Sequence, residues 1–160
     1  MPAQVAGGGT KWAGRPGSGK VWCAEGSMQP RTIYHAVTRD QFLRGMAGET
    51  YTASSIARDG FLHCSGDPES TLRVLEDYFA SERCPILVLR IDVERVEAEV
   101  RFEAAAPLPA ALTTHLQPGA RFPHIYGALN LSAVTGVATV ARAADGFHWP
   151  ASFEALAAWS

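Results

Sequence analysis

The segment Ile86–Ile91 reads ILVLRI, and five of its six residues are aliphatic. An apolar run of this length, without the alternation of a half-exposed strand, is typical of a strand that is buried on both faces. We therefore predict that it is the central strand of the core and that its part is structural. Further strands are expected at 99–103 and 134–140, and Asp145-Gly146 predicts a hairpin turn.

Length and composition limit the class of protein. The chain has 160 residues, which is about the length of one domain. An apolar content of 47%, a charged content of 19% and a net charge of -2 are ordinary for a soluble protein. These values disfavour a dedicated DNA-binding role, because such domains carry a basic stripe. They do not exclude a local basic pocket.

The cysteines and the apolar runs indicate the compartment. Cys23, Cys64 and Cys84 show no CxxC spacing, so we expect reduced thiols rather than a disulfide framework or a structural zinc site. No apolar run has the length of a membrane span, and the amino terminus lacks the apolar stretch of a secretory signal. We expect a cytoplasmic protein without a membrane partner.

Residues 1–30 are rich in Gly, Ala and Ser and show neither a helical nor a strand period. We interpret them as a flexible extension, followed by a single domain at 31–160. Within the extension, residues 14–20 read GRPGSGK and copy the spacing of a phosphate-binding P-loop. Val21 stands where a Ser or Thr is needed, and no strand precedes the motif, so we reject this interpretation.

Two helices are predicted by their first residues. Thr38 with Gln41 has the spacing of a capping box, which predicts a helix to about Met46 after a strand at 32–37. Asp67-Pro68 combines an N-cap with a proline at the first helical position. The buried stripe expected for this second helix contains Leu72, Leu75 and Phe79, widened by Val74 and Tyr78. The proline-rich stretch 104–119 reads as a long loop, and we take His115 in it as incidental.

Three histidines lie in segments that are dense in aromatic and hydroxyl side chains. His35 is expected on the face of the first strand that also carries Ile33 and Val37. The segment 59–65 reads DGFLHCS, in which alternation places His63 and Ser65 on one face and turns Cys64 toward the core. This alternation weakens the hypothesis of a cysteine nucleophile beside a histidine base, because neighbouring strand residues point to opposite faces.

The third segment, 121–127, reads RFPHIYG. In an extended conformation His124 and Tyr126 share a face that suits stacking on a base or a pyridine ring. In the alternating strand before it, Glu103 is a candidate catalytic carboxylate. A solvated strand face is the competing interpretation of Glu103, and the pattern alone favours it.

Three histidines from separate segments allow a metal site, a general acid and base, or the polar lining of a nucleotide pocket. The sequence has no HExxH motif or tight ligand pair, so a metal site is not indicated. Tyr34 and Tyr126 lie close in sequence to two of the histidines, which favours a planar ligand. A set of packed core histidines bonded to the backbone remains the structural alternative.

The segments 33–35 (IYH), 60–65 (GFLHCS), 87–92, 100–103 (VRFE) and 122–127 (FPHIYG) resemble the small bacterial and plant family catalogued as domain of unknown function 952. The resemblance covers roughly residues 32–150. It implies an α+β fold similar to that of the ADP-ribosyltransferases, in which two small, mostly antiparallel sheets with two main helices form a cleft that holds NAD.

The resemblance also implies site residues. His35 matches the histidine that holds the adenosine ribose in those enzymes, and Tyr34, Ser65 and Tyr126 are the further residues expected to bind NAD. His63, His124 and Glu103 are the candidate catalytic residues. The third motif has no Glu, so the site looks more similar to the RNA 2′-phosphotransferases than to protein ADP-ribosyltransferases. We expect NAD as a substrate and RNA or a small molecule as acceptor, with a nucleotide-binding module without turnover as the alternative.

Overall fold

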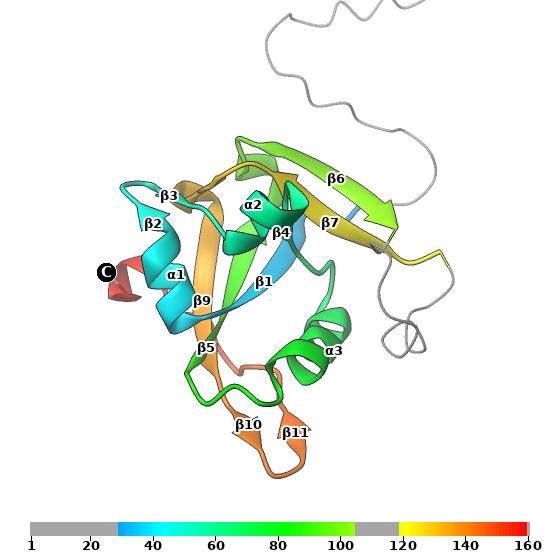
Figure 1. Ribbon diagram of the computed structural model, residues 1–160, viewed down its shortest axis with the longest axis vertical. Coiled ribbons are helices and arrows are strands. Elements are labelled where there is room, and N and C mark those ends of the chain that lie inside the picture. The colour runs from blue at the N-terminus through cyan, green and yellow to red at the C-terminus, as the bar shows by residue number, and fades with distance from the viewer. Residues whose placement is uncertain (1–28, 105–118, 160) are drawn as a thin grey trace, which may run out of the picture.

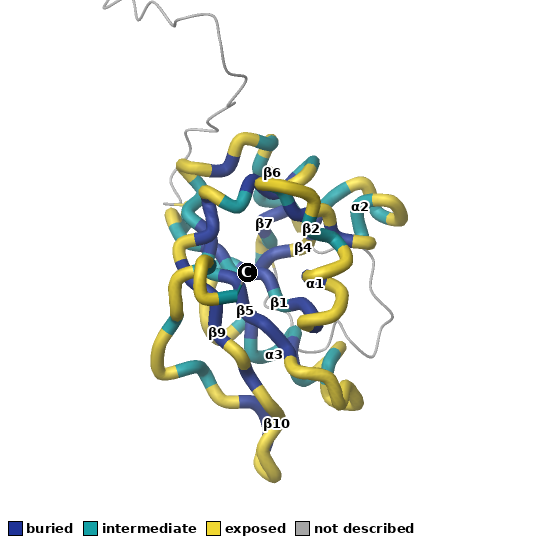
Figure 2. The backbone as a smooth tube through the Cα atoms, turned by 90° about the vertical axis from the view of Figure 1, so that its left-hand side faces the viewer, coloured by how far each residue is buried: buried dark blue, intermediate teal, exposed yellow. Residues whose placement is uncertain are grey.

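The structure is a computed structural model, and it describes residues 29–104 and 119–159. The extension up to residue 28, its P-loop-like motif, and the part of the expected loop that contains His115 lie outside the described residues. Figure 1 shows the arrangement of the elements, and Figure 2 shows how far each residue is buried.

The central sheet consists of β1 (Thr32–Thr38), β5 (Ile86–Asp92) and β9 (Val134–Val140) in the order β1-β5-β9. Both pairings are antiparallel, and β5 lies in the middle. Residues 86–89 are all buried, so the central strand predicted from the apolar run is confirmed. In Figure 2 long stretches of these strands are dark blue, the colour of buried residues.

A second sheet carries two of the three histidines. It consists of β4 (Leu62–His63), β7 (Arg121–Tyr126) and β6 (Glu99–Ala104) in the order β4-β7-β6, with antiparallel pairing throughout. Leu62 pairs with Ile125 and His63 with His124. Leu62 and Ile125 are fully buried. Because side chains alternate along a strand, the histidines project from the opposite face of this sheet.

The two predicted helices are present with their caps. Helix α1 (Arg39–Gly45) begins after Thr38, whose side chain accepts a hydrogen bond from the Gln41 amide. Helix α3 (Pro68–Phe79) begins after Asp67, which caps the Ser70 amide. The expectation that Tyr78 widens the buried stripe of α3 is wrong, because Tyr78 is 50% exposed.

A third short helix, α2 (Ser54–Asp59), was not expected, because its hydroxyl-rich sequence equally suits a turn. The other elements are β2 (Met46–Ala47), β3 (Thr50–Tyr51), β8 (Leu129–Asn130), β10 (Arg142–Ala143) and β11 (Gly146–Phe147), with 3-10 turns at Val93–Arg95, Leu131–Ala133 and Leu156–Trp159. The predicted hairpin is β10-β11. The segment after Pro150 contains only the last of these turns.

The described residues thus form an α+β fold of small antiparallel sheets. It has three sheets of three strands and one hairpin, more than the two sheets that the family resemblance implies. Ile33, His35 and Val37 share one face of β1, as predicted, and this face is buried. On the other face Tyr34 and Ala36 pack against a second cluster that contains Leu75 of α3. Among the described residues no helix has the length and apolar character needed to cross a membrane.

Candidate functional site

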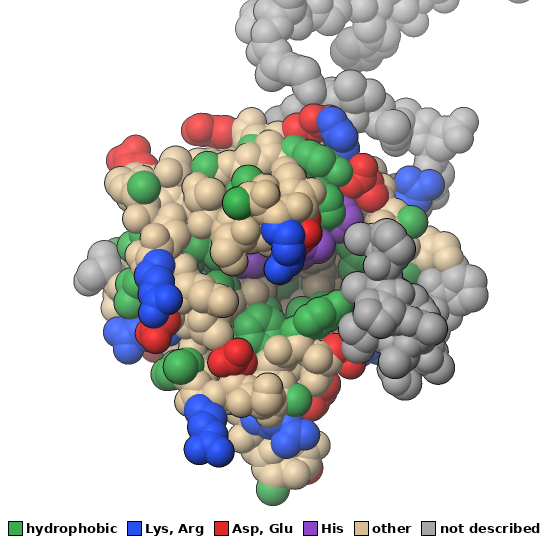
Figure 3. All heavy atoms as spheres, in the orientation of Figure 1, with side chains coloured by type: hydrophobic (Ala, Val, Ile, Leu, Met, Phe, Trp, Pro, Cys, Tyr) green, Lys and Arg blue, Asp and Glu red, His purple; other side chains and the backbone are tan. Residues whose placement is uncertain are grey.

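Three histidines from β1, β4 and β7 converge. The rings of His63 and His124, which are register partners, have centroids 5.4 Å apart at 77°. His35 joins them through the backbone, because its Nδ1 donates to the carbonyl oxygen of His63 over 2.7 Å. Figure 3 shows histidine side chains along the edge of a hollow between α2 and α3, with hydrophobic side chains along the opposite edge.

His124 forms a hydrogen-bonded pair with Glu103. Its Nδ1 lies 2.9 Å from Oε2 of Glu103, and the hydroxyl of Tyr126 donates to the same oxygen over 2.6 Å. The hydrogen bond from Tyr126, followed by that from His124, lowers the pKa of Glu103. An ionised carboxylate only accepts hydrogen bonds, so Nδ1 of His124 carries a proton and Nε2 is the basic nitrogen of the neutral ring. The predicted candidate Glu103 therefore lies in the histidine cluster.

His63 forms a similar pair with Asp59. Its Nε2 lies 2.8 Å from Oδ2 of Asp59, and Arg58 binds both oxygens of the same carboxylate at 2.9 and 2.8 Å. The hydrogen bond from Arg58, followed by that from His63, lowers the pKa of Asp59. Gly60 makes this geometry possible, because its φ of 85° ends α2 in a left-handed turn that leads directly into β4.

Aromatic rings surround the two histidines. Phe61 stacks on His124 with centroids 4.0 Å apart and also contacts His63 and Tyr126. The guanidinium of Arg101 lies 4.2 Å above the ring of Tyr126. The ring of Tyr126 therefore already has neighbours, and a planar ligand can stack on it only after Arg101 or Phe61 moves.

His35 is buried and bonded at both ring nitrogens. Since Nδ1 donates to the His63 carbonyl, Nε2 accepts from the hydroxyl of Tyr51 at 3.3 Å. Burial lowers its pKa to about 4, so the ring is neutral near pH 7. In this structure His35 supports the position of His63, and a ribose hydroxyl can reach its Nε2 only by replacing Tyr51.

Tyr34 and Ser65 lie apart from the cluster. Tyr34 faces the other side of β1, where its ring packs edge-on against Trp149 with centroids 4.9 Å apart. Ser65 is buried and pairs with Tyr34 through two backbone hydrogen bonds of 2.8 Å. Within the described residues no hydrogen bond joins Ser65 to His63, which is bonded to Asp59 instead.

Cys64 points into the core, as alternation predicts. It is 6% exposed, and burial raises the pKa of its thiol, so it is unsuited to act as a thiolate nucleophile. In the part of the chain that the structure describes, no group of three or more His, Cys, Asp or Glu side chains is arranged to hold a metal ion.

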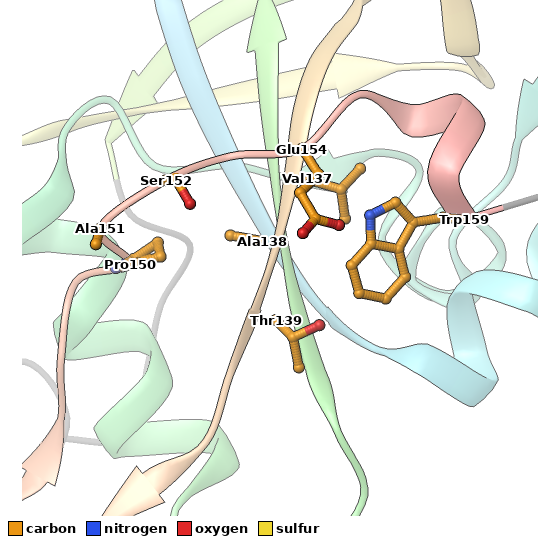
Figure 4. Close-up of a pocket in the computed structure, with 8 residues that line it drawn as sticks. All are labelled: Val137, Ala138, Thr139, Pro150, Ala151, Ser152, Glu154 and Trp159. Atoms are coloured by element: carbon orange, nitrogen blue, oxygen red, sulfur yellow. The ribbon is translucent and has the colours of Figure 1, made fainter.

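A shallow pocket of about 340 Å³ lies elsewhere, between β9 and the carboxyl-terminal segment (Figure 4). It is lined by residues that include Thr139, Ser152, Glu154 and Trp159, and none of its lining residues belongs to the histidine cluster. It holds a single titratable carboxylate and no histidine. We therefore assign the candidate site to the histidine-lined hollow.

Sequence reasoning missed Asp59, Arg58, Tyr51 and Arg101 as members of the site. A signal for Asp59 exists, since it precedes His63 by four residues, but the Asp-Gly pair reads first as a turn. Glu103 and Arg101 were visible as an alternating polar strand face. That face is only partly solvated, because His124 and Tyr126 of the neighbouring strand contact it.

Comparisons with known proteins agree with the fold. The family model described as protein of unknown function (DUF952) matches residues 36–137. A crystal structure of protein CC0527 from Caulobacter crescentus is 26% identical, covers 72% of this chain and 91% of its own, and has a TM-score of 0.58. The solution NMR structure of CC0527 is 25% identical, with coverages of 73% and 90% and a TM-score of 0.55. None of the curated proteins matches this chain.

Proposed function

This chain belongs to the DUF952 family, and we propose that its histidine-lined hollow is the active site of an NAD-dependent transferase of the ADP-ribosyl or 2′-phosphotransferase type. One observation carries the proposal: His63 and His124 face each other, and each is held by a carboxylate. Paired histidines near neutral pH can take up and release protons, and such proton transfer accelerates reactions roughly a hundredfold to ten-thousandfold.

The resemblance to the ADP-ribosyltransferase fold supports NAD as the substrate. In those enzymes an acid near the third motif steadies the positive charge on the ribose as nicotinamide leaves. Here the third motif lacks a Glu of its own, and Glu103 on β6 reaches it through His124 and Tyr126. In this proposal Glu103 acts through His124, while RNA or a small molecule is the acceptor.

Tyr126 and His35 can contact NAD only after a neighbouring side chain moves. Tyr126 stacks on nicotinamide after the guanidinium of Arg101 leaves its ring face. His35 anchors the ribose after its Nε2 exchanges the Tyr51 hydroxyl for a ribose hydroxyl. Without the exchange at Nε2, His35 serves the reaction by holding the backbone of His63.

The proposal is tested with NAD itself. The purified chain is incubated with millimolar NAD, and binding is measured by calorimetry and nicotinamide release by chromatography. We expect binding with slow release, and a loss of release of roughly a hundredfold or more in His63→Gln and His124→Gln.

The matched control is His148→Gln. His148 also bonds a carboxylate, Oδ1 of Asp145 at 2.8 Å, but it lies near the β10-β11 hairpin and is 65% exposed. This variant is expected to behave like the unmodified chain. Absence of NAD binding at millimolar concentration contradicts the proposal, and binding without release in the unmodified chain favours the nucleotide-binding module.

A further inference from the structure

The two histidine–carboxylate pairs use different ring nitrogens. Asp59 is bonded to Nε2 of His63, whereas Glu103 is bonded to Nδ1 of His124. Both carboxylates are ionised acceptors, so each bonded nitrogen carries a proton. The nitrogens left for a ligand are therefore Nδ1 of His63 and Nε2 of His124, and the described residues supply no hydrogen bond to either.

Because of this arrangement the two rings can have different catalytic roles. A neutral His124 offers an unprotonated Nε2, which is a base. A protonated His63 offers an N–H at Nδ1, which is an acid, and the Asp59 carboxylate faces the positive ring on the other side. A base and an acid at a centroid separation of 5.4 Å can act on two oxygens of one small group.

The chemistry of the leaving group indicates which class of substrate can use both an acid and a base. Nicotinamide leaves NAD as a neutral molecule and requires no proton, so NAD cleavage uses the two histidines to deprotonate and orient the acceptor and leaves no part for an acid. An alkoxide leaving from phosphorus does require a proton, and the hydroxyl that displaces it must lose one. Arg58, which is bound to the same Asp59 and has a side chain 75% exposed, supplies positive charge beside His63 for a phosphate group.

We propose that this site also cleaves phosphodiesters that carry a neighbouring hydroxyl, as ribonucleotides do, with His124 as base and His63 as acid, and without NAD. The hydroxyl gives its proton to Nε2 of His124, and its oxygen forms a bond to phosphorus. The bond from phosphorus to the leaving oxygen breaks, and that oxygen takes the proton from Nδ1 of His63. The products are a cyclic phosphate and a free alcohol, and solvent exchange restores both rings.

The pH dependence follows from the groups around the two rings. These are Arg58 and Asp59 of α2, His35 of β1, Arg101 and Glu103 of β6, and Tyr126 of β7. Asp59 and Glu103 are positioning residues here. Because one ring has to be neutral while the other is protonated, the rate passes through a maximum with pH.

The first test needs no turnover. Nitrogen-15 NMR of the histidine-labelled full chain distinguishes protonated from unprotonated ring nitrogens. We expect the Nδ1–H form for His124 and the Nε2–H form for neutral His63, with loss of the preference in Glu103→Gln and Asp59→Asn respectively. The same tautomer for both rings overturns the assignment of base and acid, whatever the result with NAD.

The second test uses the dinucleotide uridylyl-3′,5′-adenosine with EDTA and without NAD, and its 2′-deoxy counterpart as the negative probe. We expect release of adenosine from the ribo form alone, reduced roughly a hundredfold or more in His63→Gln and His124→Gln and unchanged in His148→Gln. Equal cleavage by all variants indicates a contaminating nuclease and overturns the proposal, as does no cleavage by the unmodified chain. Either outcome rules out phosphodiester cleavage by this site but does not bear on the proposed reaction with NAD, which the NAD assay tests separately.

Discussion

Oε2 of Glu103 lies 2.9 Å from Nδ1 of His124, although the two residues are diagonal neighbours rather than register partners. Glu103 is opposite Phe122, and Arg101 is opposite His124. Diagonal side chains on one face of an antiparallel pair are within reach of each other when they are long. Because of this contact, the half-exposed face of β6 forms one wall of the site.

Replacing Glu103 by Gln is expected to lower turnover roughly a hundredfold, because a neutral amide no longer fixes the His124 proton at Nδ1 or balances the charge of the protonated ring. Steady-state rates of nicotinamide release measure the effect. Glu99→Gln is the control, since Glu99 is on the same strand face but bonds Arg101. Equal losses in both variants would argue against a specific part for Glu103.

Acid is expected to destabilise the fold through His35. Its pKa is about 4 in the folded state and near 6.5 when solvated, so the unfolded chain binds more protons between these values. Stability therefore falls as the pH drops from 6.5 to 4, by at most about 3 kcal/mol from this group, and this contribution changes no further below pH 4.

Urea denaturation at several pH values measures this dependence. His35→Asn, which retains a donor for the His63 carbonyl, is expected to be less stable at pH 7 but to show a shallower loss between pH 6.5 and 4. His148→Gln, at an exposed histidine, is the control. An unchanged slope in His35→Asn would show that the folded chain does not keep His35 neutral.

Gly45→Ala is expected to destabilise the fold by about 1 to 3 kcal/mol, because a methyl group there overpacks the end of α1. The added carbon would lie 2.6 Å from a ring carbon of Tyr51 and 2.5 Å from the carbonyl oxygen of Thr52. Thermal unfolding measures the loss. Gly66→Ala is the control, since its closest neighbour is Pro30 at 3.4 Å, and a similar loss there would contradict the explanation by overpacking.

Asp67→Ala is expected to cost roughly 1 kcal/mol, the usual value of a helix N-cap. The Asp67 carboxylate accepts from the amide of Ser70 at 2.7 Å and from its hydroxyl at 2.8 Å. Urea denaturation monitored by circular dichroism measures the change. Asp77→Ala, at an exposed residue of the same helix, is expected to change stability much less, and the reverse order would rule out the cap as the cause.

Local patterns were enough for several elements. The apolar run at 86–91 predicted the central strand, and Thr38 and Asp67 predicted where α1 and α3 begin, because each depends on residues close in sequence. Alternation correctly turned Cys64 inward and placed His124 and Tyr126 on one face. Local patterns did not predict helix α2, because its sequence also suits a turn.

The sequence by itself determined which segments form the longer strands, where the two longer helices begin, and that three histidines lie in dense aromatic segments. Only the tertiary structure decided what those histidines contact. The pairing of β4 with β7 brings His63 to His124, the turn at Gly60 brings Asp59 to His63, and the pairing of β6 with β7 brings Glu103 to His124. The two strand pairings join distant segments, and no period within one segment specifies them.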